Sequence, residues 1–160
     1  DSAEANGALI DLGGVLYGTT GQGGAYYEKG TVFSLTTNGT GKVLHNFDAR
    51  CGKRVDGAFP SGSLIDLNGT LYGTTSEGGK YGSSYYCDGY GTVYTVTPSG
   101  RVKVLYSFGS TSGDGTTPVR ELTKLNGILY GITYYGGACG DGTVFSITLS
   151  GTEKVLHSFC

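Results

Sequence analysis

Leu16-Tyr17-Gly18-Thr19-Thr20 opens a pattern that this chain repeats three times. A glycine-rich stretch follows it, then Gly-Thr-Val with Phe or Tyr, and then a segment that runs from Val-Leu to a closing Phe. The same pattern begins again at Leu71 and at Leu129. Self-similarity at a period of about 50 residues is typical of arrays in which each copy is one supersecondary unit. The repeat therefore predicts the architecture.

The composition of the 160-residue chain is typical of an all-β protein with many turns. Glycine accounts for 31 residues and tyrosine for 13, whereas charged residues make up only 15%. A net charge of −2 without a basic cluster predicts that the chain has no nucleic-acid partner. No apolar run approaches the roughly 18 residues that a membrane span needs. The chain starts at Asp1 and contains no Met, which predicts a processed mature form or a fragment.

Four strands are expected in each copy, and a two-residue turn joins the first two. The turns Gly13-Gly14, Asn68-Gly69 and Asn126-Gly127 tolerate the positive φ angles of a type I′ hairpin. The expected strands are 8–12, 15–20, 31–36 and 42–47 in the first copy, 63–67, 70–75, 92–97 and 102–108 in the second, and 120–125, 128–133, 143–148 and 153–159 in the third.

Four antiparallel strands connected up and down form one blade of a β-propeller. We therefore expect an all-β fold of three four-stranded antiparallel blades in a propeller-like array. The blades span residues 1–55, 56–113 and 114–160 and make up one structural unit.

These motifs resemble the GloVer (Gloeobacter/Verrucomicrobia) tandem repeat over essentially the whole chain. The resemblance implies a secreted or surface-anchored bacterial protein built as a propeller-like array, with no defined activity and no catalytic residues. Propellers typically have four to eight blades, and this chain has three copies. The first and third blades would each expose a face, which a second chain could cover.

Side chains that could carry out chemistry are few, and we expect no enzyme activity, no cofactor and no metal. His45 and His157 share a repeat position with Tyr106, which favours a packed aromatic with a polar tip over a metal ligand or base. We expect His45 to share one strand face with Val43 and Phe47, and His157 to lie between Val155 and Phe159 in the same way.

The carboxylates are scattered. Asp11 and Asp66 share a repeat position that is Lys124 in the third copy, so this site faces solvent or a central channel. A carboxylate pair for glycoside hydrolysis is the alternative interpretation. Asp114 and Asp141, each next to Gly, are explained more simply by turn chemistry than by calcium binding.

Tyrosines gather among glycines in the loops between second and third strands. Such side chains suit sugars or protein partners, but they could equally fill the spaces between blades. Asn38 and Asn68 match the N-glycosylation sequon, although both lie in expected hairpin turns. The candidate binding residues are Tyr26, Tyr27, Tyr81, Tyr85, Tyr86, Tyr90, Tyr134 and Tyr135.

The four cysteines favour disulfides and an oxidising compartment. Cys51 lies in the link after the first blade and Cys87 in the long loop of the second, and both emerge on the same face of a propeller. We expect these two to pair. Cys139 and Cys160 then remain; they could pair with each other, or Cys160 could reach a neighbouring chain.

Three function classes follow from these features. The leading one is a secreted or cell-surface structural protein that self-assembles by contacts of blade 3 with blade 1 of another copy, as a ring or a filament. The second is a glycan- or protein-binding module that uses the tyrosine-rich loops. An enzyme acting through a central channel is the least favoured.

Overall fold

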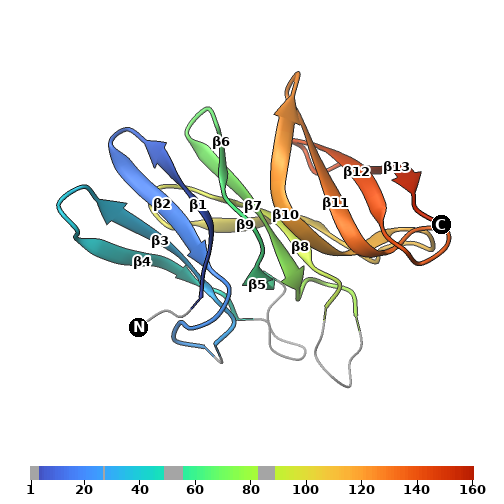
Figure 1. Cartoon of the computed structure of the whole chain (residues 1–160), viewed down its shortest axis with the longest axis horizontal. Coiled ribbons are helices and arrows are strands. Elements are labelled where there is room, and N and C mark those ends of the chain that lie inside the picture. The colour runs from blue at the N-terminus through green and yellow to red at the C-terminus, as the bar shows by residue number, and fades with distance from the viewer. Residues whose placement is uncertain (1–3, 27, 49–55, 83–88) are drawn as a thin grey trace.

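The computed structural model describes residues 4–26, 28–48, 56–82 and 89–160. Within these ranges the chain forms thirteen β-strands and no helix. The strands make three antiparallel sheets that follow one another along the longest axis of the molecule (Figure 1). The expected all-β fold of repeated antiparallel sheets is confirmed.

Each sheet is built by one copy of the repeat, and we number the sheets in chain order. Sheets 1 and 3 have four strands each, whereas sheet 2 has five because its first strand is divided. Sheet 1 contains β1 (Ala5–Leu12), β2 (Val15–Thr20), β3 (Thr31–Thr36) and β4 (Gly41–Asn46). Sheet 2 contains β5 (Ala58–Pro60), β6 (Ile65–Leu67), β7 (Thr70–Glu77), β8 (Thr92–Val96) and β9 (Val102–Ser107). Sheet 3 contains β10 (Gly115–Leu125), β11 (Ile128–Gly136), β12 (Thr143–Thr148) and β13 (Glu153–Ser158).

The first strand of each sheet begins earlier than the sequence predicts, and it is irregular at one shared point. The register shifts between Asn6 and Ile10 in β1 and between Val119 and Thr123 in β10. In sheet 2 the chain leaves the ladder altogether at the same point, which separates β5 from β6. The sequence does not indicate β5 as a regular strand, because it contains Pro60 and because the alternation of apolar and polar residues is interrupted there. The expectation of four strands in sheet 2 was therefore wrong.

The predicted hairpin turns are confirmed. Both residues of each turn have positive φ, as in Asn68 (54°) and Gly69 (80°), or Asn126 (52°) and Gly127 (76°). This backbone matches the right-handed twist of the paired strands that the turn joins.

A bulge in the last strand changes the predicted facing of His45. Val32 pairs with His45 and its neighbour Phe33 pairs with Val43, so Leu44 is the extra residue of the bulge. Adjacent residues of β3 point to opposite faces, and therefore His45 and Val43 do too. The same shift occurs in β9 and β13. The prediction that His45 and Val43 share a face, and likewise His157 and Val155, was wrong because simple alternation counts no bulge.

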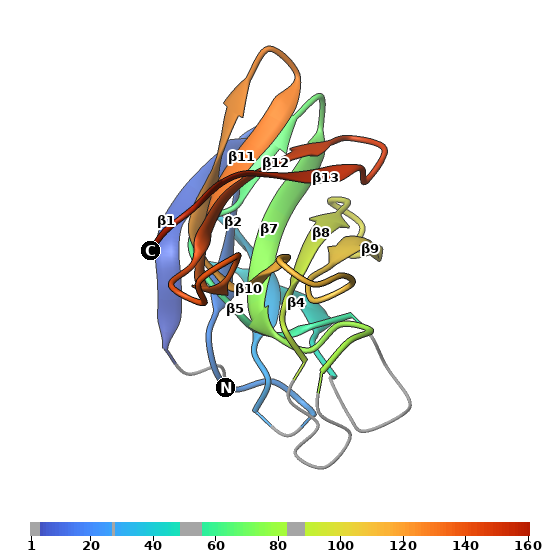
Figure 2. The ribbon, with the colours of Figure 1, turned by 90° about the vertical axis from the view of Figure 1, so that its right-hand side faces the viewer.

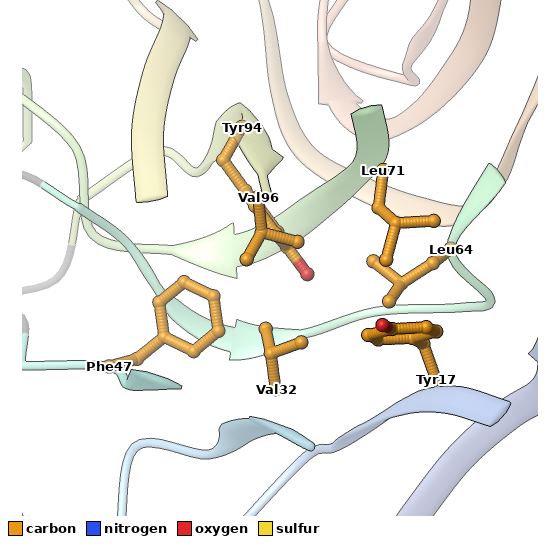
Figure 3. Packing of buried hydrophobic residues seen from close by; sticks show 7 residues of the cluster. All are labelled: Tyr17, Val32, Phe47, Leu64, Leu71, Tyr94 and Val96. Carbon is orange, nitrogen blue, oxygen red and sulfur yellow. The ribbon is translucent and has the colours of Figure 1, made fainter. Parts of the chain in front are cut away.

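Each sheet has two distinct faces, and the sheets stack with unlike faces together. We call the face toward the following sheet the trailing face and the face toward the preceding sheet the leading face. Tyr17, Val32 and Phe47 on the trailing face of sheet 1 pack against residues of sheet 2 such as Leu64 and Tyr94 (Figure 3). The rings of Phe47 and Tyr94 meet edge to face with centroids 5.1 Å apart.

The same contact recurs one sheet further along. Tyr72, Val93 and Phe108 on the trailing face of sheet 2 join a second buried cluster with Phe145 and Leu122 of sheet 3. The Phe108 and Phe145 centroids are 5.0 Å apart, again edge to face. The core of the protein is thus two copies of one interface between sheets. Figure 2, turned by a right angle from Figure 1, shows the sheets from the side of sheet 3.

Candidate functional site

The trailing face of sheet 3 is open. Its Phe159 is 45% exposed, whereas the equivalent Phe47 and Phe108 are both fully buried by the next sheet. The face holds a hollow of about 440 Å³. The hollow is lined by Val119, Ile132, Thr133, Tyr134, Tyr135, Asp141 and Phe159.

The leading face of sheet 1 is open in the same way at the other end of the molecule. Its Leu9 is 48% exposed, whereas the equivalent Leu64 of sheet 2 is buried at 3%. Val43 is also exposed. Phe33 pairs with Val43 across β3 and β4 on this face and is partly buried. The two ends therefore present the two unlike halves of the interface that fills the core.

Among the predicted tyrosines in the described part of the chain, Tyr134 and Tyr135 are brought together. Tyr134 and Tyr135 are both exposed on β11, meet edge to face with centroids 4.6 Å apart, and line the hollow. Tyr26 is exposed in the loop after β2, and Tyr81 and Tyr90 lie in the loop after β7. Tyr27, Tyr85 and Tyr86 lie outside the described residues. Binding by these tyrosines stays a prediction.

At each contact between neighbouring sheets, which we call a seam, an Asp that precedes the following sheet meets an aromatic ring of the preceding sheet. Sequence analysis did not predict either of these pairings. His45 packs edge to face on Phe47, as expected for a packed aromatic, and its Nε2 lies 2.9 Å from Oδ2 of Asp56. At the next seam the Tyr106 hydroxyl donates to Asp114 over 2.8 Å. The signal was present in the sequence, because Asp56 and Asp114 each begin an Asp-Gly pair four residues before a Pro.

Asp114 belongs to a cluster of acidic and phenolic groups at the seam between sheets 2 and 3. It is nearly buried, and it accepts backbone N–H groups of Gly109 and Ser110 as well as the Tyr106 hydroxyl. The turn role expected for Asp114 is thus present and extends to the seam. Burial, and then the charge of Asp114, raise the pKa of the neighbouring Glu153 to about 7. Burial is also the main reason that the pKa of Tyr106 is raised.

The other predicted carboxylates serve local turns. Asp11 accepts the N–H of Gly14 and Asp66 accepts the N–H of Gly69, each over 2.8 Å. This hydrogen bonding gives each of the two aspartates a role in its own hairpin turn. Across the described ranges, no three His, Cys, Asp or Glu side chains gather closely enough to hold a metal ion. The described residues also contain no helix long and apolar enough to cross a membrane.

Cys139 and Cys160 form a disulfide within the chain. Of the two arrangements that the sequence left open for this pair, the intrachain bond is the one observed. The bond ties the loop after β11 to the segment after β13, next to Phe159 of the hollow. Cys51 and Cys87, which we expect to pair, lie outside the described residues.

Comparison with known families gives a match that covers the whole chain. The Gloeobacter/Verrucomicrobia repeat matches residues 1–160. No curated protein matches the sequence.

Proposed function

The chain belongs to the Gloeobacter/Verrucomicrobia repeat family, and we propose that it is a structural protein of the extracellular space, without enzymatic activity, whose copies join head to tail. In this assembly the trailing face of sheet 3 packs on the leading face of sheet 1 of the next copy. The disulfide between Cys139 and Cys160 suits an oxidising compartment of this kind.

One observation carries the proposal. The chain already makes the trailing-to-leading contact twice within itself, with the same or a similar apolar residue at each position. Leu9 at one end and Phe159 at the other belong to the two halves of a third such contact. Exposed apolar faces of this kind usually mark an interaction site. A second copy is the partner whose faces match both ends.

The energetics of such a contact depend on more side chains than the few that are most exposed. Burying a Phe, Ile or Leu side chain contributes about 1.5–3 kcal/mol, and each junction would cover Phe159 and Ile132 of one copy and Leu9 of the other. Because Phe159, Ile132 and Leu9 are already about half covered, each of them would contribute about half of that, roughly 0.7–1.5 kcal/mol. Association costs several kcal/mol in lost freedom of motion, so the whole face has to contribute.

Sedimentation velocity over micromolar concentrations tests the proposal. The wild-type protein should sediment as an assembly, and Ile132→Glu or Leu9→Glu should each reduce it to monomers by placing a charge on one end face. Leu149→Glu is the matched control, because Leu149 is also an exposed leucine but lies in the turn between β12 and β13. A wild-type protein that stays monomeric throughout the series would overturn the proposal.

A second candidate function is glycan or protein binding through the tyrosines, and the pairing of Tyr134 with Tyr135 favours it. Two exposed aromatic rings beside a carboxylate form a surface on which sugar rings can stack. Glycan-array binding by the wild-type protein that is lost in Tyr134→Ala/Tyr135→Ala would support this function. An array without saturable binding would exclude glycans from this surface.

A further inference from the structure

The hollow on sheet 3 has a counterpart on each of the other sheets, and there it is filled. In both cases the first segment of the following sheet lies in it. The Phe59 N–H donates to the Lys29 carbonyl, and the Thr117 N–H donates to the Tyr90 carbonyl, each over 2.8 Å. A proline follows each of these donors, at Pro60 and Pro118.

Sequence position identifies the groups that would meet if a second copy filled the hollow on sheet 3. Asp141 precedes Gly142-Thr143 as Lys29 precedes Gly30-Thr31, so its carbonyl is the equivalent acceptor. Glu4 occupies the donor position, and its backbone has the same unusual conformation as the two donors inside the chain. The φ angles are 57° at Glu4, 53° at Phe59 and 56° at Thr117. The backbone just before β1 thus has the same conformation at this residue as the segments that fill the hollows inside the chain.

The side chains at these two positions are close enough to interact. Lys29 Nζ lies 4.4 Å from the ring centroid of Phe59, across the seam between sheets 1 and 2. Between two copies the same positions hold Asp141 and Glu4, which are both acidic. Resting on the head-to-tail assembly proposed above, we propose that Asp141 meets Glu4 of a second copy, and that this like-charge contact keeps the junction between copies weaker than the seams within a copy.

The same junction also lacks two hydrogen bonds that the internal seams have. Thr19 donates to the Gly62 carbonyl over 3.1 Å and Thr74 to the Arg120 carbonyl over 3.2 Å, but the equivalent residue of sheet 3 is Ile132. Asn6 and Ser61 donate to the carbonyls of Pro60 and Pro118. Their equivalent in sheet 3 is Val119.

These replacements leave an apolar contact with fewer directional bonds at the end of the chain. Apolar burial supplies the attraction, and the carboxylate pair opposes it. The junction is therefore weaker than the internal seams, which are held by covalent connection as well as by these additional hydrogen bonds.

A charge-swap cycle measured by sedimentation equilibrium tests this contact. Asp141→Lys and Glu4→Lys should each tighten self-association by roughly fivefold, because each turns a repulsive pair into an attractive one at an exposed site. The double variant Asp141→Lys/Glu4→Lys should return toward the wild-type constant, since two lysines then face each other. Added salt should reduce the differences between the four proteins.

Asp66→Lys is the matched control. It makes the same change in net charge on the middle sheet, at a position where sheet 3 carries Lys124. Its association constant should stay close to that of the wild type. If the single variants fail to tighten association, or if their effects add in the double variant, the contact between Asp141 and Glu4 is refuted even though assembly stands. If no protein of the set associates, both the contact and the assembly are refuted.

Discussion

Glycine in the Leu-Tyr-Gly-Thr-Thr pattern leaves room for an aromatic ring. A Cβ built on Gly73 would lie 2.6 Å from the hydroxyl oxygen and 2.7 Å from Cζ of Tyr94. The equivalent Gly18 and Gly131 lie equally close to Phe33 and Phe145. The ring of the third strand therefore rests on the glycine of the second strand. This contact explains why the glycine and the aromatic recur together in the pattern.

Gly73→Ala should destabilise the protein by about 2–3 kcal/mol, because an extra methyl group in a packed core forces its neighbours to move. Tyr94 is fully buried, so its ring has no solvent-facing space to move into. Urea unfolding followed by tyrosine fluorescence measures the change. Gly41→Ala is the control, since its Cβ would meet nothing closer than Leu35 Cδ1 at 3.7 Å, and it should change stability little. Equal losses in both variants would refute the explanation.

The threonines of the pattern have a repeated role that sequence analysis did not assign. Thr20 and Thr31 hydroxyls lie 2.9 Å apart, and the pairs Thr75–Thr92 and Thr133–Thr143 lie 2.8 Å apart. Each pair is buried between the second and third strands of its sheet. A hydrogen bond satisfies each hydroxyl, which removes the cost of burying it.

Among the strands and turns, the regular features were predictable and the irregular ones were not. The turns at Asn68-Gly69 and Asn126-Gly127 follow from local backbone chemistry, so residue type was sufficient to place them. The bulge at Leu44 depends on how β4 pairs with β3, and no residue type in β4 indicates it. The division of the first strand of sheet 2 depends likewise on its neighbours.

The candidate site was predictable in outline only. Three copies of a blade pattern imply two open faces, and the exposed Leu9 and Phe159 bear this out. The partners His45–Asp56 and Tyr106–Asp114 come from different copies, so only the stacked sheets reveal them. Tyr134 and Tyr135 were identified as candidates. Val119 and Ile132 beside them were not, because aliphatic residues are common in strands.

The seam between β9 and β13 makes stability depend on pH through Glu153. The pKa of this carboxyl is raised from 4.5 to about 7 in the folded protein. Between these values the folded state binds more protons than the unfolded state, so stability falls as pH rises from about 4.5 to 7. Because Glu153 is only half-buried, solvent screening limits the loss to about 1 kcal/mol.

Glu153→Gln should remove this loss, because the amide stays neutral at every pH in the window. Between pH 4.5 and 7 the unfolding free energy of the wild type should therefore fall relative to that of the variant. Glu121→Gln, which removes an exposed carboxylate from β10, serves as the control and should parallel the wild type. Parallel curves for Glu153→Gln and the wild type would contradict the assigned cause.

The open faces of sheets 1 and 3 differ in their residues and lie at opposite ends of the molecule (Figure 1), which makes the proposed contact heterologous. Such contacts close into a ring when the rotation permits and otherwise continue as a filament. Two copies would bring six blade-like sheets together, which lies within the four to eight blades of known propellers. We therefore expect a ring of two copies.

Mixing two single-face variants separates these assemblies. Leu9→Glu keeps an intact trailing face on sheet 3, and Ile132→Glu keeps an intact leading face on sheet 1, so together they can make one junction and no more. In a ring, two wild-type copies make two junctions, and the second junction closes within the same complex. Two wild-type copies should therefore bind each other at least about a hundredfold more tightly than the mixed pair of variants. The wild-type particle should also stop growing at twice the monomer mass. In a filament, the mixed pair would bind as tightly as one wild-type junction, and the wild-type mass would rise with concentration. That second pattern in sedimentation equilibrium would replace the ring with a filament.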